Sequence, residues 1–461
     1  MNNSIQATQE EKLEYLAYHT SEDFFKNMND GIRVISEMKQ YNLAKNHALI
    51  CGGMAAFDKG VLDFLNVWKT YVQQKGYTCV LLSEVTAEYR RYTGKRVHMP
   101  FLCPPHLLAK EIIVLGLEIP VTDEMVIHIN RKMYLKFAAE SMRIRHPDLG
   151  INYEIAWTYY ADMYINILLH KIKPKIVYLW NQFYAFHRII EGICLEREIQ
   201  VEYMEFGCLP GTITIEQGGQ QGESWVAAKH KKLKKGYISK QDFLKTKDIL
   251  TYLKTSGLNR NIQNPIIFQY SMLNRYKNGQ PIITYFGQND YESGLHPYTE
   301  KTRKYHSPVF RTTLDALQFL ELLSIRNEWN LIYKPHPIIV SLGLNKETKC
   351  KGKYTEILDV DINSLIEASS VVVTILSQSA YISLIREVPV VMLGYTQLRY
   401  KKCNYEAFKK EVIEKRIKQA IKKGLTMQQR KAFMFHCTQL IKHYLYDDLT
   451  KKSISIGKGL L

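Results

Sequence analysis

The stretch VVVTILSQSAYISLIREVPVVMLG, residues 371–394, is the part of this 461-residue sequence that best indicates its fold. It begins with an apolar, β-branched run at 371–376, continues as a helical pattern after Ser379, and ends in a second apolar run at 389–394. A strand, a helix and a second strand in this order form a βαβ unit, whose two strands lie parallel in one sheet. Because both runs lack polar positions on either face, we expect helices to cover both sides of that sheet.

Runs of the same kind recur on both sides of this stretch and alternate with longer amphipathic patterns. The clearest helical patterns are YEIAWTYYADMYINILLHKI at 153–172 and KEVIEKRIKQAIKKG at 410–424. This alternation predicts an α/β fold built from doubly wound parallel sheets. The further predicted strands are 47–53, 78–84, 175–180, 201–207, 281–288 and 330–337.

The predicted domain boundary lies within residues 255–280, where Asn, Gly, Pro and Ser replace helical periodicity. Two doubly wound domains bind ligands at the carboxyl ends of their strands, so we expect the active site in a cleft between them. The predicted parts are an N-terminal helical segment 1–45, a Rossmann-like acceptor domain 46–265, a Rossmann-like donor domain 281–400, and basic helices 401–461 that pack back toward the first domain.

The composition restricts the class of protein. Hydrophobic residues make up 46% and charged residues 23%, which is typical of a globular chain and excludes a disordered one. No run approaches the roughly 20 apolar residues of a membrane span, and the N-terminus has no signal-peptide core. The eight cysteines include no C-x-x-C pair, which argues against a zinc site or a disulfide framework. We therefore expect a protein of the reducing cytoplasm without a metal or a cofactor.

The formal net charge of +17 indicates a polyanionic partner. Basic runs at 229–236, 399–403 and 410–424 are each explained by a solvated surface, but together they favour docking on anionic lipid. No helix-turn-helix, RNA-recognition or zinc signature accompanies them, so we expect no nucleic-acid partner.

Two motifs at strand ends of the second domain predict a phosphate site. In NLIYKPHP (330–337) a histidine and a lysine follow a buried strand, where they can neutralise a phosphate or supply a proton. In SQS (377–379) small hydroxyl residues precede a helix whose free N–H groups bind anions; simple helix capping is the alternative. A third loop, after the strand 281–288, is expected to face the donor. The candidate donor-binding residues are Lys334, His336, Ser377, Gln378, Ser379 and Gln288.

A glycine-rich loop supplies the candidate catalytic carboxylates. The strand 201–207 ends in Glu205-Phe206-Gly207, and the loop that follows carries Glu216 and Glu223 among several glycines. Glycine beside acidic residues suits a loop that approaches a polar ligand closely, and a strand-end carboxylate can act as a base or nucleophile. The alternative is a mobile surface loop with solvated glutamates. Along with these carboxylates, His336 is a catalytic candidate.

Acceptor-binding candidates lie in the first domain. Gly52 and Gly53 end the strand 47–53, but they lack a full G-x-G-x-x-G pattern, so a dinucleotide is not indicated. Asn181 and Gln182 follow the strand 175–180, where they can bind acceptor hydroxyls; a helix cap is an alternative of equal weight.

The order EFGCLPGTITIEQGGQQGES, ITYFGQND, YKPHP and SQS resembles that of bacterial capsule and lipopolysaccharide glycosyltransferases related to the capsular Kdo transferases. The resemblance covers roughly residues 175–395. It implies the GT-B architecture of two facing Rossmann-like domains, with a nucleotide-sugar donor on the second and its phosphate near His336, Ser377 and Ser379. The family's E-D-G motif aligns with Glu205-Phe206-Gly207, where Phe206 replaces the second acid. The resemblance therefore leaves three candidates for the catalytic carboxylate, which are Glu205, Glu216 and Glu223.

These observations together predict a cytoplasmic, membrane-peripheral glycosyltransferase. It would move a sugar from a CMP- or UDP-sugar to a capsule or lipopolysaccharide glycan, or to a lipid-linked acceptor. One alternative is a polyol-phosphate transferase of the teichoic-acid type with a CDP-alcohol donor. The other is a non-enzymatic, basic nucleic-acid-binding protein.

Overall fold

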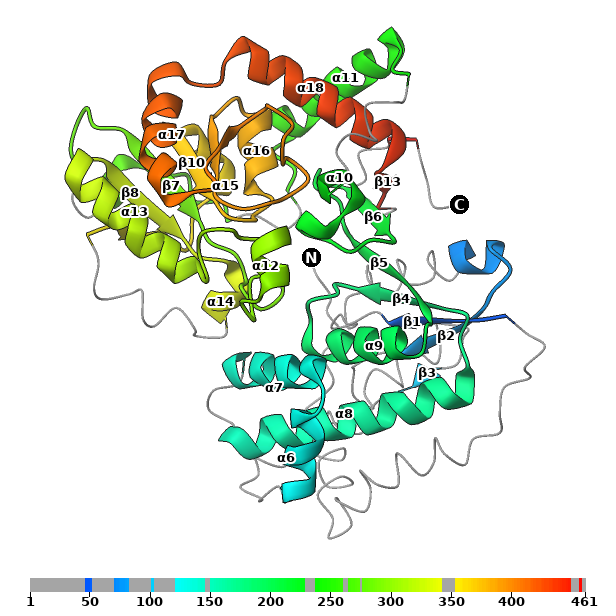
Figure 1. Ribbon diagram of the computed structural model, residues 1–461. Helices are drawn as coiled ribbons and strands as arrows, with labels where there is room; N and C mark the ends of the chain where they lie inside the picture. Colours follow the sequence, from blue (N-terminus) through cyan, green and yellow to red (C-terminus); the bar gives the residue numbers. More distant parts are fainter. Residues whose placement is uncertain are drawn as a thin grey trace. The chain divides into compact units, whose positions relative to one another are not determined.

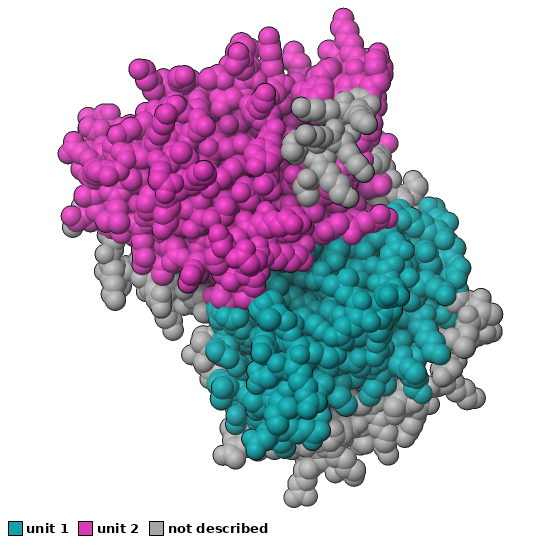
Figure 2. All heavy atoms as spheres, in the orientation of Figure 1, with its two compact units in different colours: residues 1–205, 460–461 teal, residues 206–459 magenta. Residues whose placement is uncertain are grey.

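The computed structural model describes residues 46–51, 70–82, 101–102, 121–145, 150–228, 237–259, 264–273, 276–341, 353–448 and 456–457. The chain forms two compact units, which Figure 2 colours separately. Unit 1 comprises residues 1–205 with 460–461, and unit 2 comprises residues 206–459. The division falls before the predicted boundary at 255–280, because the segment after residue 205 packs into the core of unit 2.

Unit 1 contains a parallel sheet whose first strand lies in the middle. Its strands in spatial order are β3 (Phe101–Leu102), β2 (Thr78–Leu82), β1 (His47–Cys51), β4 (Ile176–Trp180) and β5 (Gln200–Phe206). This is the strand order of a Rossmann fold, and the direction of strand addition reverses between β1 and β4. In such a sheet, ligands bind at the carboxyl ends of the strands on either side of the reversal.

The described helices of unit 1 share one core with the sheet (Figure 1). They are α6 (Asp123–Asn130), α7 (Met133–Arg145), α8 (Gly150–Ile172) and α9 (Ala185–Glu196). Trp157 and Ile165 of α8 and Ile189 of α9 are buried in it together with Leu49 of β1 and Val177 of β4. The helix predicted at 153–172 is confirmed as the greater part of α8.

Unit 2 contains a six-stranded parallel sheet with the full Rossmann strand order. Its strands are β9 (Thr355–Glu356), β8 (Asn330–Lys334), β7 (Ile282–Phe286), β10 (Val371–Thr374), β11 (Val390–Met392) and β12 (Tyr405–Glu406). Here too the first strand, β7, lies inside the sheet, and the order reverses between β7 and β10. The strands β6 (Thr212–Glu216) and β13 (Tyr446–Asp447) pair with each other antiparallel.

Helices cover both faces of the six-stranded sheet. Successive residues of a strand point to opposite faces, so neighbouring residues pack against different helices. Val373 packs with α13 (Thr313–Asn327) and α17 (Lys410–Lys423), whereas its neighbour Val372 packs with the helices of the other face. Those helices are α11 (Lys240–Ser256), α15 (Ile362–Glu367), α16 (Ser379–Ile385) and α18 (Met427–His443) (Figure 1). Shorter elements are α10 (Trp225–Ala228), α12 (Glu300–Tyr305), α14 (Pro337–Ser341), η3 (Gln221–Glu223) and η5 (Tyr270–Met272).

The predicted α/β class with two Rossmann-like parallel sheets is confirmed. The facing of two domains that the GT-B architecture adds to it stays a prediction. The C-terminal helices were expected to pack back toward the range 46–265. In the structure α18 packs against α11, and β13 pairs with β6. The C-terminal segment therefore contacts residues of the range 46–265. These contacting residues all belong to unit 2.

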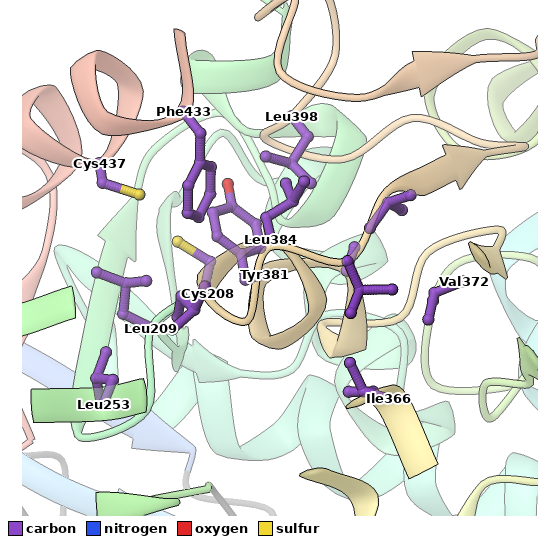
Figure 3. Packing of buried hydrophobic residues seen from close by; sticks show 14 of the residues in the cluster. Cys208, Leu209, Leu253, Ile366, Val372, Tyr381, Leu384, Leu398, Phe433 and Cys437 are labelled. Atoms are coloured by element: carbon purple, nitrogen blue, oxygen red, sulfur yellow. The ribbon is translucent and has the colours of Figure 1, made fainter. Parts of the chain in front are cut away.

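A buried cluster joins α16, α18 and the loop after β5 in unit 2 (Figure 3). The Tyr381 hydroxyl forms a 2.9 Å hydrogen bond with His436 Nε2, and its ring lies beside Phe433. The cysteines that the structure describes are buried free thiols, two of them, Cys208 and Cys437, in this cluster. Within the described residues, no helix combines the length and the apolar character of a membrane span.

Candidate functional site

The candidate site of unit 2 lies where its strand order reverses. Gln288 comes two residues after the end of β7, and Ser377–Ser379 come directly after the turn that ends β10. The Leu376 N–H approaches Gln288 Oε1 at 3.5 Å, which joins the two strand ends. Gln288 and the SQS motif thus lie at the position at which a sheet of this order binds its ligand, whereas Lys334 and His336 follow the neighbouring strand β8.

Gln288 holds the β7 loop in place. It is buried, and its Nε2 donates to Asp290 Oδ1 at 3.0 Å and also contacts Thr313 Oγ1. The Thr313 N–H donates to Asp290 Oδ2 at 2.8 Å, which ties the same loop to the start of α13. Burial raises the pKa of Asp290. Gln288 is therefore a positioning residue in this structure, and direct contact with the donor stays a prediction.

The SQS motif combines a helix cap with a buried hydroxyl. Ser377 Oγ accepts from the Ser379 N–H at 3.2 Å, and the Ser377 N–H donates to Thr374 Oγ1 at 3.2 Å. The half-buried Gln378 makes no side-chain capping bond. Ser379 Oγ is buried and has no hydrogen-bond partner among the described residues. Ser377 thus accepts a bond from the first N–H of α16, and the contact of Ser379 with a donor phosphate stays a prediction.

His336 and Lys334 have different environments although both follow β8. The Ile338 N–H donates to His336 Nδ1 at 3.3 Å, so a neutral His336 carries its proton on Nε2 and can donate it. Lys334 Nζ donates to the Leu358 carbonyl at 2.6 Å. Burial lowers the pKa of Lys334, and the nearby Asp359 opposes this effect. The structure gives Lys334 a backbone partner, so its predicted phosphate contact remains a prediction.

Glu223 belongs to a cluster that sequence analysis missed. Its Oε1 lies 3.0 Å from His306 Nε2, and its Oε2 lies 2.9 Å from Lys301 Nζ. Burial acts to raise the pKa of Glu223, but the bonds from His306 and Lys301 outweigh it and leave the pKa below its usual value. Glu223 is therefore an ionised carboxylate with both oxygens engaged. The His306 carbonyl accepts from the Tyr395 N–H at 2.7 Å, which places the cluster at the carboxyl end of β11.

The loop before Glu223 is tightly packed and requires a glycine. A Cβ added to Gly222 would lie 1.5 Å from the Tyr305 carbonyl oxygen and 2.8 Å from that of Tyr395. Only glycine allows this approach of α12 and the β11 loop. The alternative of a mobile surface loop with solvated glutamates does not describe this segment.

Glu216 lies at the end of β6 in an apolar environment. It is 2% exposed, and burial raises its pKa to about 7, although Tyr444 and the Trp225 N–H act to lower it. The Trp225 N–H donates to Oε2 at 3.4 Å, whereas Oε1 has no hydrogen-bond partner among the described residues. Glu216 is therefore a buried carboxyl that holds its proton near neutral pH.

The candidates of unit 1 lie at its own strand reversal. Asn181 has a left-handed backbone (φ 52°), and its Oδ1 accepts from the Phe183 N–H at 3.0 Å. Burial lowers the pKa of His187 to about 4, so its neutral Nδ1–H donates to the Asn181 carbonyl at 2.9 Å. Gln182 is buried beside them. These contacts make Asn181 part of a turn between β4 and α9; the N-cap of α9 is Tyr184, which makes no side-chain capping bond. The acceptor-binding role of Asn181 and Gln182 stays a prediction.

The predicted site residues divide between the two units. Glu205 is half-buried in β5 and is the last residue of unit 1 before the division. The other carboxylates, the SQS motif, Gln288 and His336 belong to unit 2. Gly52 and Gly53 lie outside the described residues. Within the described parts of the chain, no three His, Cys, Asp or Glu side chains are grouped so as to hold a metal ion.

No protein-family model and no curated protein sequence matches the chain. Among solved structures it is similar to KpsC, a β-Kdo 2,4-transferase of Thermosulfurimonas dismutans, at 11% identity and a TM-score of 0.40, over 57% of this chain and 79% of that one. It is also similar to a Methanocaldococcus jannaschii UDP-GlcNAc 2-epimerase in complex with UDP-GlcNAc and UDP, at 12% identity and a TM-score of 0.35, over 86% of this chain and 98% of that one. The similar structures thus include a Kdo transferase, the group that the sequence motifs resemble.

Proposed function

We propose that this chain is a glycosyltransferase that binds a CMP- or UDP-sugar in unit 2 and transfers the sugar to a capsule or lipopolysaccharide glycan, or to its lipid-linked precursor. One observation carries this proposal: the unpartnered, buried Ser379 hydroxyl lies at the strand reversal of a Rossmann-ordered sheet. That is the position at which such sheets bind nucleotides.

The residues around this position suit a departing nucleotide. Transfer of a sugar leaves negative charge on the phosphate, which hydrogen-bond donors in a fixed position stabilise. Ser379 Oγ and the Nε2–H of His336 would be two such donors, and they follow β10 and β8, the two neighbours of β7. Gln288 supports them by bracing the loop after β7.

The acceptor hydroxyl needs a carboxylate to take its proton. Glu223 is ionised, but His306 and Lys301 occupy both of its oxygens. Glu216 has a pKa of about 7, so it is mostly protonated below that pH and is a poor base there. These two environments favour Glu205, at the end of β5, as the catalytic base or nucleophile.

A thermal-shift screen with CMP, UDP, GDP and CDP tests the proposal. We expect CMP or UDP to raise the melting temperature, because a ligand at 100 times its Kd adds about 2.7 kcal/mol to the free energy of unfolding. Selective stabilisation by CDP would instead favour the polyol-phosphate transferase. No stabilisation by any of the four would contradict the proposed function.

The double variant Ser377→Ala/Ser379→Ala tests the position of the donor. We expect it to weaken nucleotide binding by roughly 1–3 kcal/mol, the cost of lost hydrogen bonds to a buried ligand. Ser256→Ala, on the exposed end of α11, is the matched control and should bind like the wild type. A folded double variant with unchanged affinity would leave both serines as capping residues only.

The proposal also includes work at the inner face of the cell membrane, where lipid-linked acceptors lie. Its support is the net charge of +17 and the basic runs of the sequence.

A further inference from the structure

The outer faces of α11 and α18 form an apolar surface with a basic border. The two helices are in contact, and the rings of Phe243 and Phe435 lie 6.2 Å apart between them. A shallow, almost wholly apolar pocket opens there, lined by Phe243, Arg430, Lys431, Met434 and Phe435. We call this face, with the exposed residues Lys240, Leu244, Lys247 and Met427, the α11–α18 surface.

Helical spacing explains why apolar and basic residues alternate on this surface. Met427, Lys431 and Phe435 are four residues apart on α18, so they form one stripe along the helix. Met427 is 66% exposed and Phe435 39% exposed. On α11, Leu244 is 45% exposed between two exposed lysines. These apolar side chains are therefore partly exposed to solvent on the outer side of their helices.

Of the residues of this surface, Met434 packs against the edge of the core of unit 2. The core itself is filled from the other sides of the same helices, by Leu253 of α11 and by Phe433 and Cys437 of α18. Figure 3 shows Leu253, Phe433 and Cys437 inside that cluster. The α11–α18 surface is therefore a second apolar face of the helix pair.

The α11–α18 surface carries positive charges that are mostly not neutralised by acidic side chains. Lys240, Lys247 and Lys431 are exposed and form no ion pair with described residues. Two other cations of these helices form ion pairs, Arg430 with Glu387 and Lys442 with Asp242. The exposed acid nearest in the sequence to Lys247 is Asp248.

We propose that the α11–α18 surface docks on an anionic phospholipid bilayer. Exposed Phe, Leu and Met side chains flanked by lysines are the pattern of helices that lie in the membrane interface. The apolar side chains would enter the boundary between headgroups and acyl chains, and the lysines would meet the lipid phosphates. The inference names the contact surface for the membrane association included in the proposed function, and it does not depend on the donor site.

Co-sedimentation of the full chain with vesicles tests this surface. We expect binding to vesicles of phosphatidylglycerol and phosphatidylcholine, and little binding to phosphatidylcholine alone. Lys431→Glu should weaken binding about fivefold or more, because it replaces an attractive charge with a repulsive one. Phe435→Ser should weaken it severalfold through the loss of interfacial apolar contact.

Two variants elsewhere in unit 2 serve as matched controls. Lys415→Glu reverses an exposed charge in the basic run of α17, and Leu322→Ser removes a side chain of α13 that is 67% exposed. Both should bind vesicles like the wild type. All four variants should keep the nucleotide-induced thermal shift, so a failure of this inference is separate from a failure of the proposed function.

Three outcomes would overturn the inference. The first is unchanged vesicle binding by Lys431→Glu and Phe435→Ser. The second is a loss of binding in Lys415→Glu instead, which would move the docking to α17. The third is retention on DNA that depends on Lys431 without any binding to anionic vesicles.

Discussion

Two glutamates seven residues apart show how strongly the local environment sets the state of a carboxyl group. Glu216 lies beside Trp225 and Tyr444, and burial raises its pKa to about 7. Glu223 lies between His306 and Lys301, whose bonds leave its pKa below the usual value. In the sequence both are glutamates of one glycine-rich stretch. The partners of Glu223 lie far along the chain, His306 being 83 residues away, so sequence analysis had no local signal for them.

The raised pKa of Glu216 predicts a pH-dependent stability. The folded pKa of about 7 lies above the ordinary 4.5, so the folded state binds the extra proton and stability falls as pH rises between these values. Glu216→Gln removes this loss. We expect the variant to gain on the order of 3 kcal/mol over the wild type between pH 5 and pH 8, from about 1.4 kcal/mol per pKa unit. Urea unfolding at the two pH values measures it.

The control for Glu216→Gln is Glu300→Gln, which changes an exposed glutamate of α12. It should track the wild type at both pH values. Parallel pH curves for the wild type and Glu216→Gln would show that Glu216 is not a buried acid.

The Glu223 cluster predicts an energetic coupling. His306→Ala and Glu223→Gln should each destabilise the folded state, because each leaves a buried polar group without its partner. The double variant should lose less than the sum of the two, with a coupling of roughly 0.5–3 kcal/mol in urea unfolding. Lys304→Ala, on the exposed side of α12, should leave the free energy of unfolding nearly unchanged. Additive losses in the double variant would argue against the contact.

At the scale of elements, strands were predicted well where they are buried on both faces. All eight apolar runs contain a strand, because a parallel strand covered by helices needs apolar residues at successive positions. The strand β6 was missed and its residues were assigned to a loop. Its sequence TITIE alternates threonine and isoleucine, a half-buried strand pattern that the surrounding glycines obscured. The strands β9, β12 and β13, of two residues each, are too short to give any periodic signal.

One buried hydrogen bond joins α16 to α18 in addition to their apolar contacts. Tyr381→Phe removes the hydroxyl that bonds His436 Nε2 and leaves that nitrogen buried without this partner. We expect the free energy of unfolding to fall by roughly 1–3 kcal/mol. Tyr252→Phe, a change on the exposed side of α11, should be close to neutral in the same denaturation experiment. Equal stabilities of the two variants would mean that the Tyr381–His436 bond adds nothing.

At the scale of the whole molecule, the strand-end positions of the site residues were predictable and the division of the chain was not. A residue's place after a strand is a local property, so Asn181, Gln288 and the SQS motif were expected at strand ends and lie there. The division at residue 205 depends on contacts between distant segments, such as α11 with α18. Linker-like composition at 255–280 marks loops, and it carries no information on those contacts.

The two units predict separable contributions to turnover. Glu205→Gln keeps the shape of the side chain and removes its charge, so we expect kcat to fall roughly 100-fold or more if Glu205 is the base or nucleophile. The nucleotide-induced thermal shift should persist, because the proposed donor-binding residues belong to unit 2. Ser377→Ala/Ser379→Ala should show the reverse, with the main loss in nucleotide affinity. Normal turnover of Glu205→Gln, with an inactive Glu216→Gln or Glu223→Gln, would move the catalytic carboxylate to the glycine-rich segment.

The inner position of β7 has a consequence during synthesis on the ribosome. β7 is the first strand of its sheet to be made, and it later pairs with β8 on one side and β10 on the other. β10 begins about 85 residues after β7 ends, which at roughly 5–20 residues per second is several seconds of translation. Throughout that interval the N–H and C=O groups along one edge of β7 have no partner strand, and an open edge of this kind invites pairing with other chains. Nascent chains that stall before residue 371 should therefore be the ones that aggregate or require a chaperone.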